Sequence, residues 1–215
     1  MRRRLQPALR ENIPMKSTFM KSKSSVQTRV LLFNKPFDVL CQFTDQDGRQ
    51  TLADFIDAPG YYAAGRLDRD SEGLLLLTND GKLQQRISHP RFKLPKTYLV
   101  QLDGAIDSTS LQQLTNGVTL KDGNSSALFA NAAEEPDWLW TRNPPVRFRK
   151  SIPTSWIEIG LTEGRNRQIR RMTAAVGYPT LRLIRTSIGP FKLAALKPGD
   201  CRYEVANTIL DQTTD

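Results

Sequence analysis

The chain has 215 residues, of which 39% are hydrophobic, and it carries a formal net charge of +9 with a pI near 9.8. This length allows one sizeable core with two lobes. No apolar run approaches the length of about 18 residues that a transmembrane helix needs, and the basic N-terminus lacks the apolar segment of a secretory signal. Two distant cysteines and one histidine give no metal-site spacing. We therefore expect a cytoplasmic protein without a metal site.

Positive charge is concentrated at the two ends of the chain. Residues 1–29 contain eight Lys/Arg against one Glu, residues 30–140 ten against fifteen acidic residues, and residues 141–215 thirteen against six. Such concentration suits binding to a phosphate backbone. The alternative is a basic protein with no polyanionic partner.

The first segment is predicted to be a flexible basic arm. Residues 1–28 are rich in Arg, Lys, Pro and Ser and show little apolar periodicity. A solvated tail or a targeting sequence would have the same composition. We expect residues 29–210 to form one domain of two lobes.

Periodicity and turn residues predict alternating strands and helices along that domain. In chain order these are strand 30–33 with its partner strand 39–43, helix 51–56, strands 62–64 and 74–78, helix 82–88, strand 96–102, a helix capped by Asp107 or Ser108 and ended by Gly117, strands 118–120 and 127–132, a loop at 134–153, strand 155–161, helix 167–176, and strands 180–188 and 201–205. We interpret 123–126 as a turn. The alternation predicts an α+β fold with helices packed on a mixed sheet that bends around a cleft.

The most informative motif is GRLDRDSEG at residues 65–73, which we call the Asp68 loop. It places Asp68 between two apolar strands, with Arg66 two residues before it. A nearby guanidinium favours the ionised form of a carboxylate, and an ionised, positioned carboxylate can act as a nucleophile. Two other interpretations stay open: an ion-pair turn of Arg66, Asp68 and Arg69, or an acid/base pair of Asp68 and Asp70 like that of glycosidases.

A second basic cluster follows from helix 167–176. At about 100° per residue, Ile169 and Met172 share a buried face, whereas Arg167, Arg170 and Arg171 fall together on the other face. No acidic residue lies one turn away to pair with them. We expect this face to hold phosphates.

Tyr98 and Lys35 are two further candidates for contact with a nucleic acid. The Tyr98 ring can stack on a base, a contact worth about 1–3 kcal/mol, or simply lie half-buried in its strand. Lys35 follows the first strand at Asn34-Lys35-Pro36. It can meet a phosphate there, or be a solvated lysine in a turn.

Four stretches, at residues 33–36, 65–73, 96–100 and 161–172, resemble the RsuA-like family of pseudouridine synthases. Segments 181–190 and 196–199 resemble the closing segments of the same family, so the resemblance covers about residues 29–205. One departure is the N-terminus, where most members carry a small RNA-binding domain and this chain has only the short basic arm.

The resemblance implies the pseudouridine synthase fold, with a mainly antiparallel bent sheet, and a reaction that needs no cofactor. Asp68 matches the catalytic aspartate and Tyr98 the active-site tyrosine, while Arg66 with Arg165 or Arg170 would steady the Asp68 charge. We expect further RNA contacts from Lys35, Arg69, Lys96, Arg167, Arg171 and Arg185. The expected substrate is a uridine of large-subunit ribosomal RNA, and we expect a monomer with no membrane association.

Two other functions stay open at this point. An RNA-binding module of the same fold without activity would need only the basic ends. A hydrolase using Asp68 and Asp70 on a nucleoside or glycan would release a free base or sugar, although the basic face around Arg170 argues against a neutral sugar.

Overall fold

The computed structural model describes residues 28–147 and 149–206. The predicted arm at residues 1–28 therefore lies almost entirely outside the described residues. The strands are β1 (Arg29–Lys35), β2 (Tyr62–Ala63), β3 (Glu72–Thr78), β4 (Lys96–Asp103), β5 (Val118–Leu120), β6 (Gly123–Ser125), β7 (Phe129–Ala133), β8 (Thr154–Leu161), β9 (Thr180–Ile188), β10 (Phe191–Lys192) and β11 (Cys201–Val205). The helices are η1 (Leu52–Asp54), α1 (Gly81–Ser88), η2 (Pro90–Phe92), α2 (Ser108–Asn116) and α3 (Gln168–Ala175).

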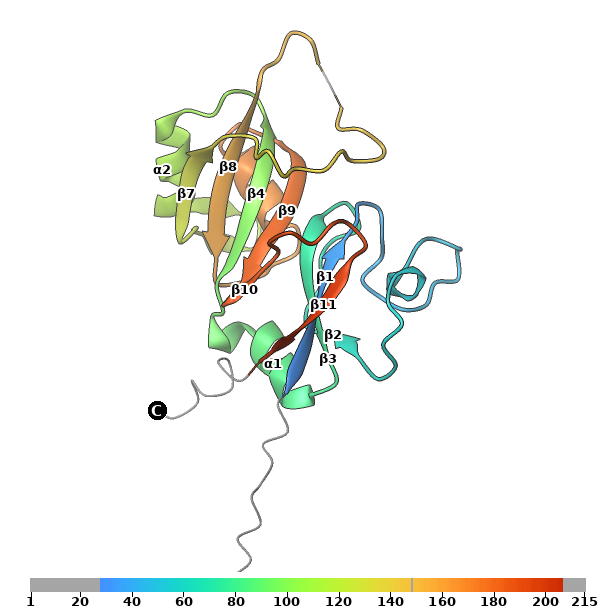
Figure 1. The fold of residues 1–215 in the computed structure, drawn as a ribbon. Helices are drawn as coiled ribbons and strands as arrows, with labels where there is room; N and C mark the ends of the chain where they lie inside the picture. Colours follow the sequence, from blue (N-terminus) through green and yellow to red (C-terminus); the bar gives the residue numbers. More distant parts are fainter. Residues whose placement is uncertain (1–27, 148, 207–215) are drawn as a thin grey trace, which may run out of the picture.

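Most strands join one mixed, mainly antiparallel sheet in the order β11-β1-β3-β9-β4-β8-β7, with β2 on β3 and β10 on β9. The sheet has two halves (Figure 1), one built around β1 and β3 and the other around β4 and β9. They are joined by a short parallel contact that pairs Glu72 with Ile184 and Gly73 with Arg185. The predicted fold class is confirmed.

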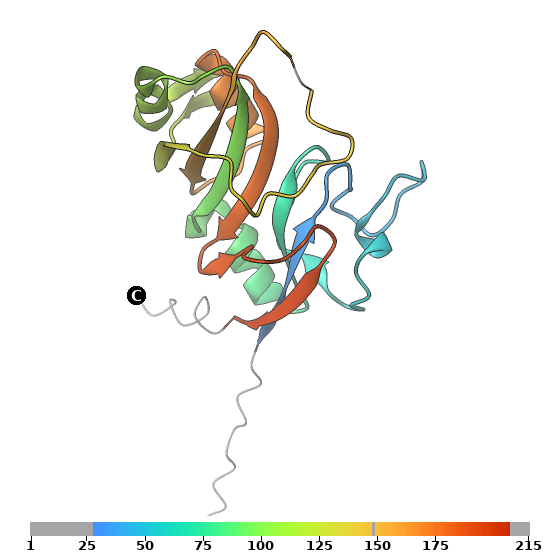
Figure 2. The same ribbon diagram turned by 45° about the horizontal axis from the view of Figure 1, so that its top comes forward.

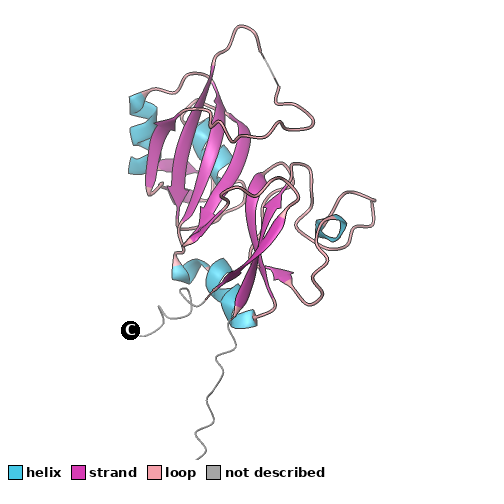
Figure 3. Ribbon diagram, viewed as in Figure 1, coloured by secondary structure: helices cyan, strands magenta, loops and turns pink. Residues whose placement is uncertain are grey.

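Both faces of the sheet are covered, because side chains alternate along each strand. On β1, Leu31 and Phe33 belong to one apolar cluster, and Val30 and Leu32 to the cluster on the opposite face. Helices η1, α2 and α3 contribute buried residues to the first cluster, and α1 to the second. Figure 3 shows these helices flanking the sheet. No helix of the described residues is long and apolar enough to cross a membrane.

Most predicted elements are present, and two predictions are wrong. Segment 39–43 does not pair with β1, because β3 and β11 already occupy both edges of that strand. Its only bridge within the described residues joins Leu40 to Thr51. The predicted turn at 123–126 instead contains β6, which forms a hairpin with β5.

A buried ion pair holds the long loop at 134–153 against the junction of the two half-sheets. Arg182 donates to both Glu72 carboxylate oxygens at 2.8 and 2.9 Å, and the indole of Trp140 donates to the same carboxylate at 2.7 Å. Arg182 also donates to the Trp140 carbonyl oxygen. Figure 2 shows this loop, in yellow and orange, reaching from one half-sheet towards the other. Since both charges are buried, removing one partner would leave the other uncompensated.

The close approach at the junction generates a first prediction. Gly73 has φ +99°, and a Cβ there would clash with the Arg185 carbonyl oxygen and lie 2.7 Å from its amide nitrogen. Gly73→Ala should therefore lower the free energy of unfolding by at least about 3 kcal/mol, measured by urea denaturation.

Gly81→Ala is the matched control, because a Cβ at Gly81 meets nothing within 4 Å. Alanine also favours the helix there, so stability should be unchanged or slightly raised. Equal stability of the two variants would contradict the role given to the junction.

Candidate active site

A cleft of about 720 Å³ opens beside the junction of the two half-sheets. Its walls come from six segments: residues 40–41, residues 64–71, the end of α1 with the start of η2, the first residues of β4, residues 161–169, and the second half of β9. The Asp68 loop thus faces β4, β9 and the segment that leads into α3. Three of the four stretches on which the family resemblance rests, at 65–73, 96–100 and 161–172, thus border the cleft, whereas the stretch at 33–36 does not.

Side chains from four other segments hold the backbone of the Asp68 loop. In chain order the contacts are Arg185 Nη1 to Arg66 O (3.4 Å), Leu67 N to Cys41 Sγ (3.2 Å), Lys35 Nζ to Arg69 O (3.3 Å) and Arg170 Nη2 to Asp70 O (2.7 Å). Leu67 is itself buried in the core. The position of Asp68 is therefore set by backbone contacts that do not use its own carboxylate.

Arg167 is the cation closest to Asp68 among the described residues. Its Nη1 lies 3.8 Å from an Asp68 carboxylate oxygen, while its two terminal nitrogens each donate to Asp70 at 2.9 Å. Arg167 adopts a left-handed backbone with φ +47° at the start of α3, a conformation that costs a non-glycine residue about 1–2 kcal/mol. Such strain often occurs at functional sites. Here it accompanies a guanidinium shared by two carboxylates.

Asp68 and Asp70 have different surroundings although they are two residues apart. Within the described residues, Asp68 accepts no side-chain or backbone hydrogen bond at its carboxylate. Partial burial would raise the pKa of Asp70, but the hydrogen bonds from Arg167 and the charges of Arg170 and Arg167 lower it below its usual value. Asp70 is thus a fixed anion that orients Arg167, whereas the Asp68 carboxylate faces the cleft.

Tyr98, Lys96 and Arg185 line the cleft opposite the Asp68 loop. Tyr98 is 8% exposed on β4, and its backbone pairs with Arg185 on β9. Burial, with a smaller effect from the charge of Arg185, lowers the pKa of Lys96 to about 8. Arg185 is also buried, and its Nη2 has no hydrogen-bond partner among the described residues. Two cations to which no described carboxylate is paired therefore sit beside the tyrosine.

The prediction that Lys35 contacts a phosphate is wrong for this structure. Lys35 is fully buried, and its ammonium donates to the carbonyl oxygens of Pro36, Val39 and Arg69. Burial lowers its pKa to about 8, partly offset by nearby anionic groups. Lys35 therefore ties the turn after β1 to the Asp68 loop. Nothing in the local sequence indicates this burial, because Asn34-Lys35-Pro36 is also typical of an exposed turn.

The arginines of the α3 segment do not act as one free basic face. Arg165 lines the cleft, but it donates to Glu163 and to the Asn124 carbonyl oxygen. Arg171 pairs with Asp122 at 2.6 Å. Arg170 reaches the Asp70 backbone and lies 3.4 Å from the Asp70 carboxylate. Among the described residues no ion pair joins Arg165 or Arg170 to Asp68, and Arg167 makes the close approach instead. The charge of Asp68 still acts on Arg170, where it favours the protonated guanidinium, so the expectation that Arg170 helps to steady Asp68 stays a prediction.

The two remaining arginines lie on the Asp68 loop itself. Arg69 pairs with Asp38 at 2.6 Å, and both side chains are substantially exposed. Arg66 is exposed at the cleft and forms no ion pair within the described part of the chain. The predicted ion-pair turn of Arg66, Asp68 and Arg69 is therefore wrong.

The sequence analysis also missed three residues that hold the site together: Cys41, Glu72 and Arg182. Their hydrogen-bond partners lie at least 26 residues away along the chain.

Comparison with known proteins gives one consistent result. The family model of RNA pseudouridylate synthases matches residues 29–175. The ribosomal large subunit pseudouridine synthase E of Vibrio vulnificus is 55% identical over 180 residues, covering 84% of this chain and 76% of that protein. The protein of the same name from Xanthomonas campestris is 52% identical over 182 residues, covering 84% and 97%. A crystal structure of a pseudouridylate synthase matches with a TM-score of 0.67 and 28% identity, covering 86% of this chain and 74% of that one.

The buried position of Lys35 generates a second prediction. Lys35→Met keeps the aliphatic stem but leaves three carbonyl oxygens without their donor, so we expect the free energy of unfolding to fall by about 2–4 kcal/mol. Urea denaturation measures this change. Lys197→Met, at an exposed lysine, should change it by less than about 0.5 kcal/mol. A Lys35→Met variant of normal stability but weakened RNA binding would restore the phosphate role.

Proposed function

Since the chain belongs to the RNA pseudouridylate synthase family, we propose that it isomerises a uridine of large-subunit ribosomal RNA with Asp68 as the nucleophile. The observation that carries the role of Asp68 is its place at the cleft, on a loop whose backbone is held by four other segments, with a carboxylate that accepts no hydrogen bond from the described residues. The names of the relatives at 52–56% identity support the large-subunit substrate.

The reaction detaches the base from the ribose at N1, turns it, and rejoins it through C5. The proton on C5 is lost and N1 gains one, so atoms and electrons balance without an oxidant, a reductant or an external energy source. An ionised Asp68 can add either to C6 of the uracil or to C1′ of the ribose. Either route needs the carboxylate unprotonated, and the guanidinium of Arg167 at 3.8 Å favours that form.

The target base must leave its stack to reach Asp68, at a cost of a few kcal/mol. We propose that Tyr98 stacks on the extruded base, since its ring lines the cleft facing the Asp68 loop. Lys96 and Arg185 lie beside Tyr98 without a carboxylate partner among the described residues. They are suited to hold the phosphate or the carbonyl oxygens of the same nucleotide. Arg66 is placed at the cleft rim to meet the flanking backbone.

All of these side chains come from one chain, which is consistent with a protein that acts as a monomer. The cytoplasm, where bacterial ribosomal RNA is made and assembled, is the compartment that fits this substrate. Both statements are part of the proposal.

Replacement of each loop aspartate generates a third prediction. Asp68→Asn should keep the fold and the affinity for RNA but lower turnover by at least about 10³-fold, because the nucleophile is lost. Asp70→Asn should lower turnover by only about 10- to 100-fold, because Arg167 and Arg170 lose their partner and misplace the loop. The measurement is tritium release from ribosomal RNA labelled at C5 of uridine, with RNA from each subunit tested separately.

Release by the wild type from large-subunit RNA alone would support the enzyme, the substrate class and, with Asp68→Asn, the nucleophile. Intact RNA binding without release from either RNA would indicate an RNA-binding module instead. Equal loss of activity in both variants, with free base or sugar as product, would favour a paired-carboxylate hydrolase.

The lowered pKa of Lys96 generates a fourth prediction. A lysine with a pKa of about 8 is charged below that pH and neutral above it. Affinity for RNA should therefore fall as the pH rises between about 7 and 9, as the attraction to phosphate is lost. Lys96→Arg should remove most of this fall, because a guanidinium stays protonated. Identical pH profiles of binding for the two proteins would contradict the role of Lys96.

A further inference from the structure

The region of α1 and η2 carries several cations, and its nearest acidic residue in the sequence is Asp80, whose carboxylate caps the N-terminus of α1 through the amides of Lys82 and Leu83. Residues 81–102 contain five Lys/Arg and no Asp or Glu, although residues 30–140 as a whole hold more acidic than basic residues. We call four of these cations the basic corner: Lys82, Arg86, Arg91 and Lys93. The acidic excess of residues 30–140 as a whole conceals this local group of cations.

The four side chains of the basic corner form no ion pair within residues 28–147 and 149–206. The α3 segment is different, because Arg165, Arg167 and Arg171 each face a carboxylate. Charge on α3 is therefore largely neutralised within the protein. Charge on the basic corner is available to an anion from outside.

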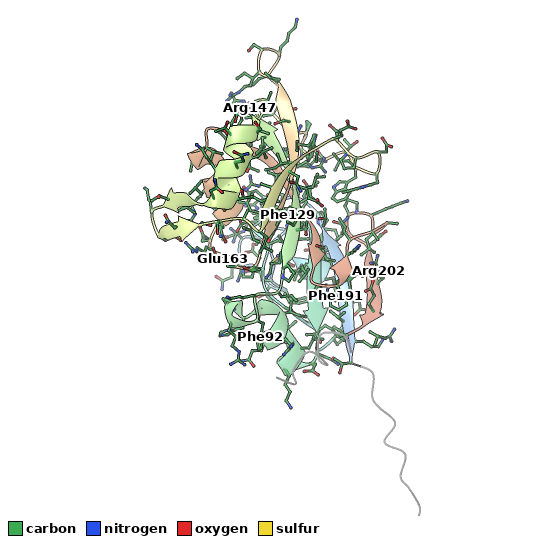
Figure 4. All side chains as sticks on the ribbon, turned by 90° about the vertical axis from the view of Figure 1, so that its left-hand side faces the viewer. Phe92, Phe129, Arg147, Glu163, Phe191 and Arg202 are labelled. Carbon is green, nitrogen blue, oxygen red and sulfur yellow. The ribbon has the colours of Figure 1, made fainter. Side chains whose placement is uncertain are left out.

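Aromatic contacts order part of the basic corner. The guanidinium carbons of Arg86 and Arg91 lie 5.1 and 4.4 Å from the centre of the Phe92 ring, and His89 meets the same ring edge-on at 6.3 Å. Figure 4 shows Phe92 beside α1 at the lower edge of the molecule, below Glu163. Lys82, Arg91 and Lys93 are exposed. Two guanidinium groups held on one ring lose less freedom when they bind a ligand.

The basic corner is continuous with the cleft. Ile87, Ser88 and Pro90, which lie between Arg86 and Arg91 in the sequence, line the cleft that contains Asp68 and Tyr98. When a target nucleotide is bound in the cleft, the RNA that adjoins it on this side would therefore pass over the basic corner. Contacts to phosphate fix register and orientation without reading sequence.

We propose that the basic corner binds the phosphate backbone of the RNA segment that adjoins the target uridine. The proposal rests on the proposed function for the presence of RNA, and it adds a binding surface outside the cleft. A phosphate contact releases counterions, so each one adds about 0.7 to 0.9 to the slope of log affinity against log salt.

The test compares two triple variants with the same loss of charge. The corner variant carries Lys82→Gln, Arg91→Gln and Lys93→Gln. The control carries Lys150→Gln, Lys192→Gln and Lys197→Gln, at exposed lysines on other segments. Affinity for ribosomal RNA is measured by fluorescence anisotropy between about 50 and 200 mM salt. Over this range the wild type should lose about 20- to 40-fold more affinity than the corner variant, because three phosphate contacts are missing from the variant.

The control should keep a salt slope close to that of the wild type. Equal changes in the two triple variants would overturn the proposal, since net charge alone would then explain the effect. An unchanged slope in the corner variant would overturn it too, and would leave the corner to another partner. If the triple variant loses its circular dichroism spectrum, the single Lys82→Gln and Lys93→Gln variants should each lower the slope by about 0.7 to 0.9. Tritium release by the wild type tests the proposed function separately, because it does not depend on this slope.

Discussion

The close approach of β3 and β9 at Gly73 is the constraint on which the rest of the site depends. These strands share only two paired positions, and a side chain at Gly73 would meet the backbone of Arg185. Immediately beside this point, the buried pair of Glu72 and Arg182 binds Trp140 of the long loop at 134–153 to the sheet. The two half-sheets therefore have one fixed junction, and the Asp68 loop enters β3 directly at that junction.

The chemistry follows from how the loop is held. Its backbone oxygens and one amide are bonded by Arg185, Cys41, Lys35 and Arg170, so the loop is ordered before substrate arrives. Preorganised groups of this kind need no rearrangement as charge develops in the reaction. Asp70 binds Arg167, and Arg167 in turn lies near Asp68. One carboxylate orients the cation, and the other is left for the substrate. The cations of the surface are of two kinds as well. The arginines of α3 are paired with carboxylates of the protein, whereas the cations of the basic corner form no ion pair among the described residues.

Much of the fold and the centre of the site could be predicted from sequence, because their signals are local. The apolar run at Leu74 and the glycines around Asp68 mark strand and turn within a few residues. The roles of Lys35, Arg165 and Arg167 each involve a partner far along the chain, at Arg69, Asn124 and Asp70 respectively. A lysine after a strand gives no sign of three carbonyl oxygens folding around it, and a helical wheel does not show that Asp122 will face Arg171. The partner of β1 was missed for the same reason, since β11 lies more than 160 residues away.

The most direct test of this account is a crystal structure of the Asp68→Asn variant bound to an RNA stem-loop that contains the target uridine. We predict that the uridine is extruded into the cleft, with its base stacked on Tyr98 and either C6 or C1′ about 3–3.5 Å from the substituted side chain at position 68. The phosphates on one side of it should lie over the basic corner. A uridine that stays stacked in the RNA, or one bound nearer to position 70 than to position 68, would contradict the assignment of Asp68 as the nucleophile.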